Sequence, residues 1–288
     1  MLAYEGERAM FEAYGRNKYT STGVIQWMLN NAWPSIIWHL YDYYLRPGGS
    51  YFGAKKGCEY LHVQYSYDDQ SIVVVNSYYQ AFPEMKVAAQ VYNLDMSLKF
   101  SKDATLDVGP DSTNKAFTLP AITGLSKTYF LRLDLDDASG KNVSSNFYWL
   151  STQPDVLDWD RSTWYYTPTK TFADLTGLQG LPKVDLNATA QSEMNGDDGV
   201  TRITVENPSH DLAFFVHFKI AAQGGRFGYE EEAGRGDDEV LPILWLDNYV
   251  SLLPGETRLI TASYAKRRLR SGKPVVKVDG WNVVPKSL

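Results

Sequence analysis

The chain has 288 residues and a net charge of −6, with 14% aromatic and 22% charged side chains. This length suits two or three domains. The negative charge argues against a nucleic-acid partner, because phosphate binding requires a basic stripe. The one basic cluster, Lys266–Arg270, is short and typical of a solvated strand end.

Cysteine and histidine usage excludes several kinds of site. The single cysteine, Cys58, cannot form an internal disulfide or a cysteine-based zinc site. The histidines show no metal-ligand spacing (His39, His62, His210 and His217), so we expect no metal and no cofactor. The sequence also lacks the motifs of serine hydrolases, P-loop NTPases and dinucleotide-binding folds.

Targeting and membrane segments are not apparent in the sequence. The N-terminal residues lack the apolar region of a signal peptide. Residues 24–45 are apolar in part, but Gln26, Asn30, Pro34 and Asp42 interrupt them, which argues against a membrane span. We therefore expect a soluble chain without a membrane partner.

The first sixty residues predict two helices around a strand. Apolar residues at helical spacing predict an amphipathic helix over Tyr4–Lys18. The run Val24–Leu29 is typical of a strand buried on both faces of a parallel sheet. Ser50–Cys58 reads as a short helix with a serine cap. A single parallel strand needs neighbours, so we expect the chain to begin in the middle of a domain.

Carboxamides and tryptophans surround the end of this predicted strand. Asn30, Asn31 and Trp33 follow it directly, and Trp27 lies within it. Flat aromatic faces beside amide donors and acceptors suit a sugar ring, which has apolar C–H faces and a rim of hydroxyls. An aromatic core with two polar end residues is the alternative, and composition alone does not separate the two.

Two β-rich regions follow. The first contains seven strand-like segments: Leu61–Tyr67, Ser71–Tyr79, Lys86–Leu94, Ser97–Val108, Lys115–Leu119, Thr128–Leu135 and Val143–Leu150. The second also contains seven: Lys183–Gln191, Val200–Asn207, Leu212–Ala222, Val240–Trp245, Tyr249–Leu253, Thr257–Tyr264 and Pro274–Val278. Strand number and spacing favour β-sandwiches of immunoglobulin type over barrels. Within Thr128–Leu135, the leucines at positions 131, 133 and 135 alternate with Arg132 and Asp134, which predicts a sheet buried on one face.

The connections between these segments differ in character. Residues 153–182 are rich in aromatics and proline, so we expect an ordered linker packed against both neighbours, since flexible linkers lack large aromatics. The loop Gln223–Glu239 is long for a hairpin. Its acidic residues match no calcium-binding spacing, so a solvated loop is the favoured interpretation.

Several blocks of the sequence resemble glycoside hydrolase family 2. They are Asn17–Thr20, Gly23–Pro34, Tyr41–Tyr44, Tyr51–Lys56, Glu59–Tyr65, Asp237–Tyr249 and Leu253–Glu256, and so they span nearly the whole chain. They look most like exo-β-D-glucosaminidases, with β-mannosidases and plant-type endo-β-mannosidases as relatives.

The resemblance implies a mainly β fold with a specific domain order. Residues 1–58 would be the helix–strand–helix remnant of a catalytic (β/α)8 barrel, and residues 59–152 and 183–288 two immunoglobulin-like β-sandwiches. The family hydrolyses terminal β-linked sugars with retention, using two glutamates that lie upstream of this chain. The resemblance therefore implies no catalytic residue here, and the chain alone would be inactive.

The resemblance also implies substrate-binding residues. Trp27 matches the tryptophan that forms the floor of the terminal-sugar subsite, and Asn30, Asn31 and Trp33 lie at the active-site end of the strand. Asn31 replaces an aspartate that is usual in mannosidases, which favours a glucosaminidase. The implied partners are a terminal β-linked hexosaminide or mannoside and the missing N-terminal part of the barrel, in an extracellular or periplasmic location.

The sequence leaves two other interpretations open. The longer protein that contains this chain could be a β-mannosidase, or the sandwiches could form a non-catalytic module that binds carbohydrate or protein. Asp42 lies near the end of the predicted strand, but a retaining glycosidase needs a second carboxylate about 5–5.5 Å away, and none follows from the sequence.

Overall fold

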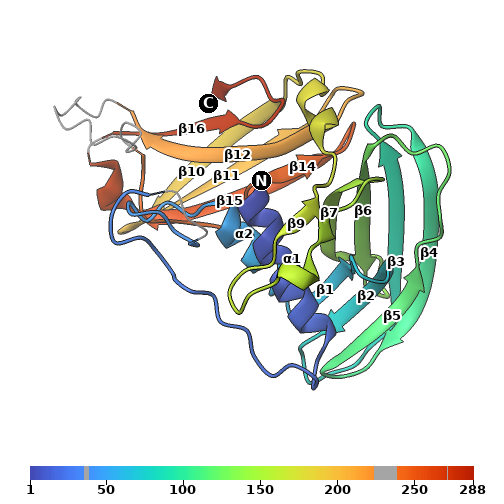
Figure 1. Ribbon diagram of the computed structural model, residues 1–288. Helices are drawn as coiled ribbons and strands as arrows, with labels where there is room; N and C mark the ends of the chain where they lie inside the picture. The colour runs from blue at the N-terminus through green and yellow to red at the C-terminus, as the bar shows by residue number, and fades with distance from the viewer. Residues whose placement is uncertain (36–38, 224–238, 271) are drawn as a thin grey trace. The chain divides into compact units, whose positions relative to one another are not determined.

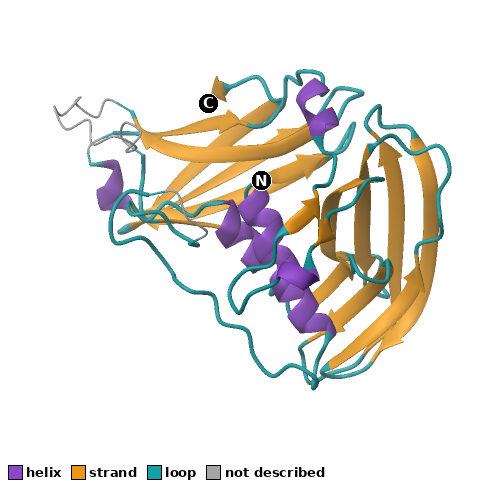
Figure 2. Ribbon diagram, viewed as in Figure 1, coloured by secondary structure: helices purple, strands orange, loops and turns teal. Residues whose placement is uncertain are grey.

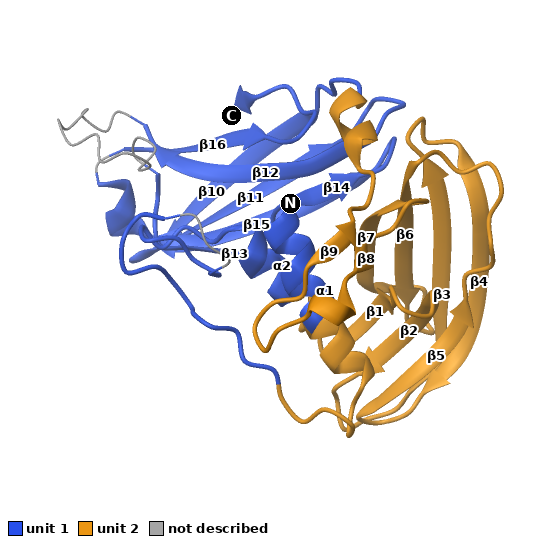
Figure 3. Cartoon of the chain, viewed as in Figure 1, with its two compact units in different colours: residues 1–10, 24–56, 182–288 blue, residues 11–23, 57–181 orange. Residues whose placement is uncertain are grey.

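The computed structural model describes residues 1–35, 39–223, 239–270 and 272–288, and antiparallel β-sheets dominate it (Figure 1 and Figure 2). The predicted mainly β class is confirmed. The chain divides into two compact units (Figure 3): unit 1 contains residues 1–10, 24–56 and 182–288, and unit 2 contains residues 11–23 and 57–181. Most of the predicted loop 223–239 lies outside the described residues.

Both predicted helices are present, as α1 (Leu2–Arg16) and α2 (Gly49–Gly57). Glu5 lies in the first turn of α1 and Arg16 in its last, as the helix dipole favours. The backbone and side-chain amides of Asn17 both donate to Ala13 O, at 3.3 and 2.8 Å, and this satisfies a carbonyl that the helix leaves free at its end.

In unit 1 the two helices approach closely at Gly53 of α2. A Cβ atom at this position would lie 2.1 Å from the carbonyl oxygen of Tyr4 on α1, so only glycine fits. The Tyr4 ring packs edge-on against Phe215 at 5.6 Å between centroids. These contacts join α1 and α2 to the β-sandwich of unit 1.

Unit 2 contains the first β-sandwich. One sheet has the order β1 (Leu61–Tyr65), β2 (Ser71–Asn76) and β5 (Ser112–Thr118). The other has the order β4 (Leu98–Val108), β3 (Phe82–Asn93), β6 (Thr128–Asp136) and β7 (Asn142–Ser151). All seven strands correspond to predicted segments, and every pairing among them is antiparallel.

Both sheets contribute to one apolar core in unit 2. Leu131, Leu133 and Leu135 of β6 are fully buried and pack with Ile72 and Val74 of β2. The alternation predicted for β6 therefore places its leucines on the inner face, as expected for a sandwich.

A buried polar network joins the second half of α1 to this sandwich. The two ring nitrogens of His62 on β1 lie 3.0 Å from Glu12 Oε1 on α1 and 3.0 Å from Glu59 Oε2. Glu12 Oε1 also accepts hydrogen bonds from Tyr148 Oη at 2.9 Å and Asn146 Nδ2 at 2.7 Å on β7. Burial lowers the pKa of His62, but the bonds to the two glutamates outweigh this effect and raise the pKa above its usual value.

Unit 1 contains the second β-sandwich. One sheet has the order β10 (Asn187–Asn195), β11 (Asp198–Glu206), β15 (Thr257–Ala265) and β13 (Ile243–Trp245). The other has the order β14 (Val250–Leu252), β12 (Ala213–Ala222), β16 (Pro274–Asp279) and β17 (Lys286–Ser287). Phe218 of β12 and Trp245 of β13 are buried, with ring centroids 6.3 Å apart, so the two sheets share a core.

The predicted strand Val24–Leu29 is not observed. These residues form no regular strand, and the Ile25 side chain is 84% exposed. The nearest described β-bridge joins Asn30, which follows this segment, to Tyr41. A strand needs a neighbour to satisfy its backbone groups, and none of the described strands of this chain pairs with these residues.

The aromatic linker is ordered but not packed as predicted. It contains the short paired strands β8 (Val156–Leu157) and β9 (Thr169–Thr171) and the 3-10 helices η1 (Trp159–Arg161) and η2 (Thr176–Gly180). Its large aromatic side chains are exposed: Trp159, Trp164, Tyr165, Tyr166 and Phe172. The expectation that these side chains pack against neighbouring domains is therefore wrong, since aromatic content does not specify burial by itself.

Candidate substrate-binding rim

The four predicted sugar-binding residues lie in one segment of unit 1, which we call the rim (residues 27–33). Trp27 and Trp33 are exposed, and Trp27 retains 73% of its accessible surface. Asn30 is half-buried, whereas only 5% of Asn31 is exposed. The rim thus presents two large aromatic surfaces around a buried carboxamide, a combination that suits the apolar and polar sides of a sugar ring.

The two asparagines differ in their hydrogen bonds. Asn30 Nδ2 donates to Asn31 O at 3.2 Å, and Asn31 Nδ2 donates to Ser35 O at 3.1 Å. Asn31 Oδ1 is buried and accepts no hydrogen bond from any described residue. A buried acceptor without a donor costs about 1–3 kcal/mol, so this oxygen is a candidate acceptor for a ligand hydroxyl or amine.

A tight turn supports the rim from the C-terminal side. Tyr41 N donates to Leu29 O at 2.9 Å, which ties the turn to the start of the rim. Asp42 Oδ1 accepts from Tyr44 N at 2.8 Å and from Arg46 N at 2.9 Å. Asp42 Oδ2 lies 3.0 Å from Arg46 Nη1. The Asp42 carboxylate therefore holds the turn together, which is a poor arrangement for a catalytic acid.

Arg46 connects this turn to the sandwich of unit 1. Its Nε and Nη2 atoms lie 2.7 and 2.6 Å from Glu239 Oε2. Burial opposes the charge on Arg46, but the bonds to Glu239 and the nearby Asp42 carboxylate raise its pKa above the usual value. Glu239 is itself fixed by a β-bridge to Ala221 of β12. This pair was not predicted, because a separation of 193 residues leaves no local sequence signal.

Tyr249, on the sandwich of unit 1, lies close enough to Arg46 and Glu239 for their charges to affect its pKa. The His217 ring stacks on Tyr249 at 4.5 Å between centroids, and His217 Nδ1 lies 3.0 Å from Asp279 Oδ1. Burial, followed by the charge of Asp279, raises the pKa of Tyr249 to about 12. His217 and Lys219 thus lie on the same face of β12, and both side chains lie close to the Asp279 carboxylate.

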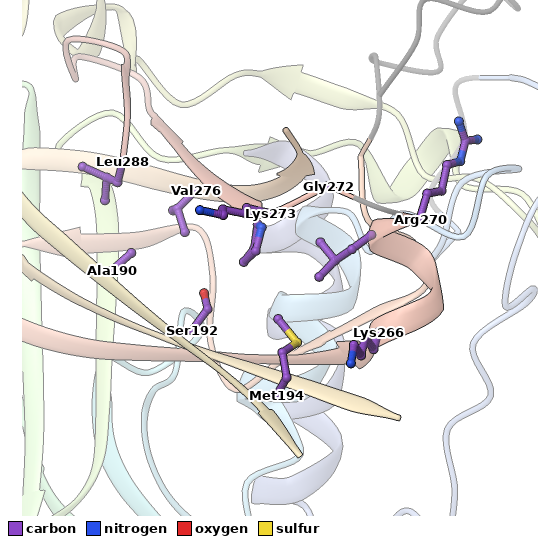
Figure 4. A pocket seen from close by; sticks show the side chains of 11 residues that line it. Ala190, Ser192, Met194, Lys266, Arg270, Gly272, Lys273, Val276 and Leu288 are labelled. Carbon is purple, nitrogen blue, oxygen red and sulfur yellow. The ribbon is translucent and has the colours of Figure 1, made fainter. Parts of the chain in front are cut away.

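A second candidate site is a cavity of about 610 Å³ in the sandwich of unit 1. Figure 4 shows Lys266 and Lys273 among its lining side chains, together with Met194, Val276 and Leu288. This volume would admit a small ligand. Two lysines repel a protonated amino sugar, however, so this cavity does not suit the ligand that the rim suggests.

Within the described ranges, no three histidine, cysteine, aspartate or glutamate side chains cluster in a way that could hold a metal ion. None of the described helices is long and apolar enough to cross a membrane.

Comparison with known families defines the class of the two sandwiches. Residues 68–153 match the family described as the mannosidase Ig/CBM-like domain. Residues 164–283 match the family described as the exo-β-D-glucosaminidase Ig-fold domain. The chain therefore carries two immunoglobulin-like domains of the kinds found in these glycosidases, as the sequence predicted.

Individual relatives narrow this class. The chain is 44% identical to an exo-β-D-glucosaminidase of Streptomyces avermitilis over 299 aligned residues, which cover 100% of this chain and 32% of that protein. It matches the crystal structure of an Amycolatopsis orientalis exo-chitosanase with a TM-score of 0.90 and 41% identity, covering 99% of this chain and 33% of that chain. A Lilium longiflorum mannosylglycoprotein endo-β-mannosidase is 24% identical over 98% of this chain and 33% of its own length.

The chain thus spans about a third of the length of these relatives. The predicted resemblance to the C-terminal part of exo-β-D-glucosaminidases, with mannosidases as more distant relatives, is confirmed.

Proposed function

We propose that this chain forms the C-terminal part of a retaining exo-β-D-glucosaminidase that removes terminal glucosamine from chitosan-type oligosaccharides. The main support is the 44% identity to an exo-β-D-glucosaminidase along the whole of this chain. The exposed tryptophans and buried carboxamide of the rim agree with it, because they offer a surface for a sugar ring. In this proposal residues 1–58 complete a (β/α)8 barrel.

The rim residues then have separate roles. Trp27 forms the floor under the terminal sugar, and Trp33 closes one side of the subsite. Asn30 and Asn31 bind polar groups of the ring, and the buried Asn31 Oδ1 accepts a hydrogen bond from the substrate. The apolar residues Val24–Leu29 become a buried strand only when neighbouring strands of the barrel pair with them.

The catalytic steps would come from elsewhere in the barrel. Retaining hydrolysis needs one carboxyl group as acid and base and a second as nucleophile. Near the rim, Asp42 and Glu239 both bind Arg46, so each is held by a cation rather than poised for proton transfer. We therefore expect this chain to bind part of the substrate and to catalyse nothing by itself.

The test compares this chain with a longer protein in which a complete barrel precedes it. We expect the longer protein to hydrolyse nitrophenyl β-D-glucosaminide and to act less well on the matching β-D-mannoside. This chain alone should release no nitrophenol above the rate in buffer. Turnover by the chain alone would contradict the assignment of both carboxylates to other polypeptide, and a preference for the mannoside would favour a β-mannosidase.

A further inference from the structure

A second group of exposed aromatic residues lies in unit 2, on the segment between β8 and β9. We call it the aromatic tip: Trp159, Trp164, Tyr165 and Tyr166. Trp164 is 94% exposed, and its ring lies 4.9 Å from that of Tyr165 in an edge-on arrangement. Folding normally buries side chains of this size, so a cluster of them in solvent marks a binding surface.

The backbone holds the tip in a defined conformation. Thr163 N donates to Tyr166 O at 2.7 Å, and Tyr166 N donates to Thr163 Oγ1 at 3.1 Å. The hydroxyls of Ser162 and Thr167 lie 2.7 Å apart at the base of the turn. These bonds fix the turn whose two central residues are Trp164 and Tyr165. The aromatic rings are therefore presented by an ordered turn, and a ligand would not have to order the backbone first.

Acidic groups accompany the rings. Asp160 follows Trp159 in η1, and its side chain is 92% exposed. Lys170 lies 3.3 Å from Asp158 but 3.7 Å from Asp160, so its stronger interaction is with Asp158. Between residues 153 and 173 there are three aspartates, one arginine and one lysine. The segment is thus slightly acidic, and its most exposed aspartate is adjacent to the aromatic surface.

We propose that the aromatic tip binds an oligomer of β-linked glucosamine, in addition to the rim at Trp27–Trp33. Each sugar offers an apolar face that stacks on an aromatic ring and an ammonium group that an aspartate or an aromatic face attracts. A neutral sugar chain would use the rings but not Asp160. This inference rests on the proposed function for its choice of sugar, whereas the site itself follows from the exposed, ordered rings.

Calorimetry of this chain with a glucosamine hexamer tests the proposal directly. We expect binding that the double variant Trp164→Ala/Tyr165→Ala weakens at least tenfold. Tyr79→Ala is the matched control, because Tyr79 is 91% exposed in the same unit and lies outside the tip. Asp160→Asn should weaken binding of the glucosamine hexamer but leave binding of the N-acetylglucosamine hexamer unchanged.

Two outcomes would overturn the proposal. One is hexamer binding that the double variant does not weaken. The other is a double variant that lowers the melting temperature of the longer protein by several degrees, since the tip would then be a contact surface for polypeptide. The proposed function is tested separately by hydrolysis of the nitrophenyl glucosaminide. That small substrate should be cleaved at a normal rate by the longer protein carrying the double variant.

Discussion

Two apolar runs of this chain have similar composition but different structures. Ser71–Asn76 forms β2, and all six of its residues are buried. Val24–Leu29 is apolar to a similar degree, but Ile25 and Leu29 are exposed. β2 pairs with β1 on one side and with β5 on the other, whereas no described strand pairs with Val24–Leu29. Hydrophobicity therefore produces a buried strand only where other strands provide backbone partners and a surface to pack on.

The buried His62 of unit 2 and the buried Asn31 of the rim differ in how well their hydrogen-bonding groups are satisfied. Both ring nitrogens of His62 have carboxylate partners, and Glu12 accepts three hydrogen bonds from the sandwich of unit 2. In the rim, by contrast, Asn31 Oδ1 has no donor among the described residues. Both ring nitrogens of His62 are thus satisfied within unit 2, whereas Glu12 Oε2 in the same network also has no hydrogen-bond partner among the described residues. The rim has groups that remain available for a ligand or for further polypeptide.

The largest expected effect comes from truncating the two isoleucines that represent these runs. Ile72→Ala should lower the free energy of unfolding of this chain by about 2–5 kcal/mol, because Ile72 is fully buried in the core of unit 2. Ile25→Ala should change it by less than about 0.5 kcal/mol, because Ile25 lies in solvent. Denaturant unfolding of both variants measures the difference, and equal losses would contradict the contrast between the two runs.

The next effect concerns Glu12 and His62. The two facing carboxylates favour the imidazolium form of His62, in which both ring nitrogens donate. Glu12→Gln should lower the free energy of unfolding by about 1.5–3 kcal/mol near pH 6, because it removes a charged acceptor that is fully buried. Glu193→Gln is a suitable control, because Glu193 forms an exposed pair with Arg202. If Glu12→Gln is as stable as the unmodified chain, the network does not contribute to the free energy of unfolding.

The same network predicts the direction of a pH effect. The pKa of His62 is raised in the folded state, so folding binds a proton that the unfolded chain releases near pH 6.5. The stabilisation is therefore complete below about pH 6.5 and is lost as pH rises through the higher folded pKa. We expect His62→Gln to flatten the fall in stability above about pH 6.5, whereas substitution of the exposed His210 should not.

A smaller effect is expected at Arg46, which ties the turn below the rim to the sandwich of unit 1. Arg46→Ala removes bonds to Asp42 and Glu239 and should lower the free energy of unfolding of this chain by about 1–2 kcal/mol. Arg46→Lys should recover only part of this loss, because a single ammonium group cannot make the several contacts that the planar guanidinium makes with both carboxylates. Full recovery by lysine would show that charge alone matters, and thermal unfolding distinguishes these outcomes.

Pattern-based prediction succeeded where the pattern and its partners lie in the same chain. All fourteen predicted strand segments of the two β regions have counterparts in the structure. The alternation around Leu131, Leu133 and Leu135 correctly identified the inner face of β6. Turn residues and alternating apolar residues are local signals, and a sandwich uses them directly.

Prediction failed where structure depends on distant or additional groups. The burial of Val24–Leu29 required a sheet that the described chain does not provide. The aromatic tip was expected to be packed, because aromatic content says nothing about which surface faces solvent. The Arg46–Glu239 pair and the His62 network join residues far apart in sequence, and a single sequence contains no signal for such contacts.

The last prediction links the rim to the proposed enzyme and concerns Trp27. In this chain, Trp27→Ala should change the free energy of unfolding by less than about 0.5 kcal/mol, because the side chain is mostly exposed. In the longer protein the same change should lower kcat/KM for a β-glucosaminide more than tenfold, which corresponds to about 1.4 kcal/mol of transition-state stabilisation. Trp27→Phe keeps a flat ring, so its kcat/KM should fall less. A near-normal rate for Trp27→Ala would show that Trp27 does not bind the sugar. Packing against other polypeptide would then explain why its side chain is exposed in this chain.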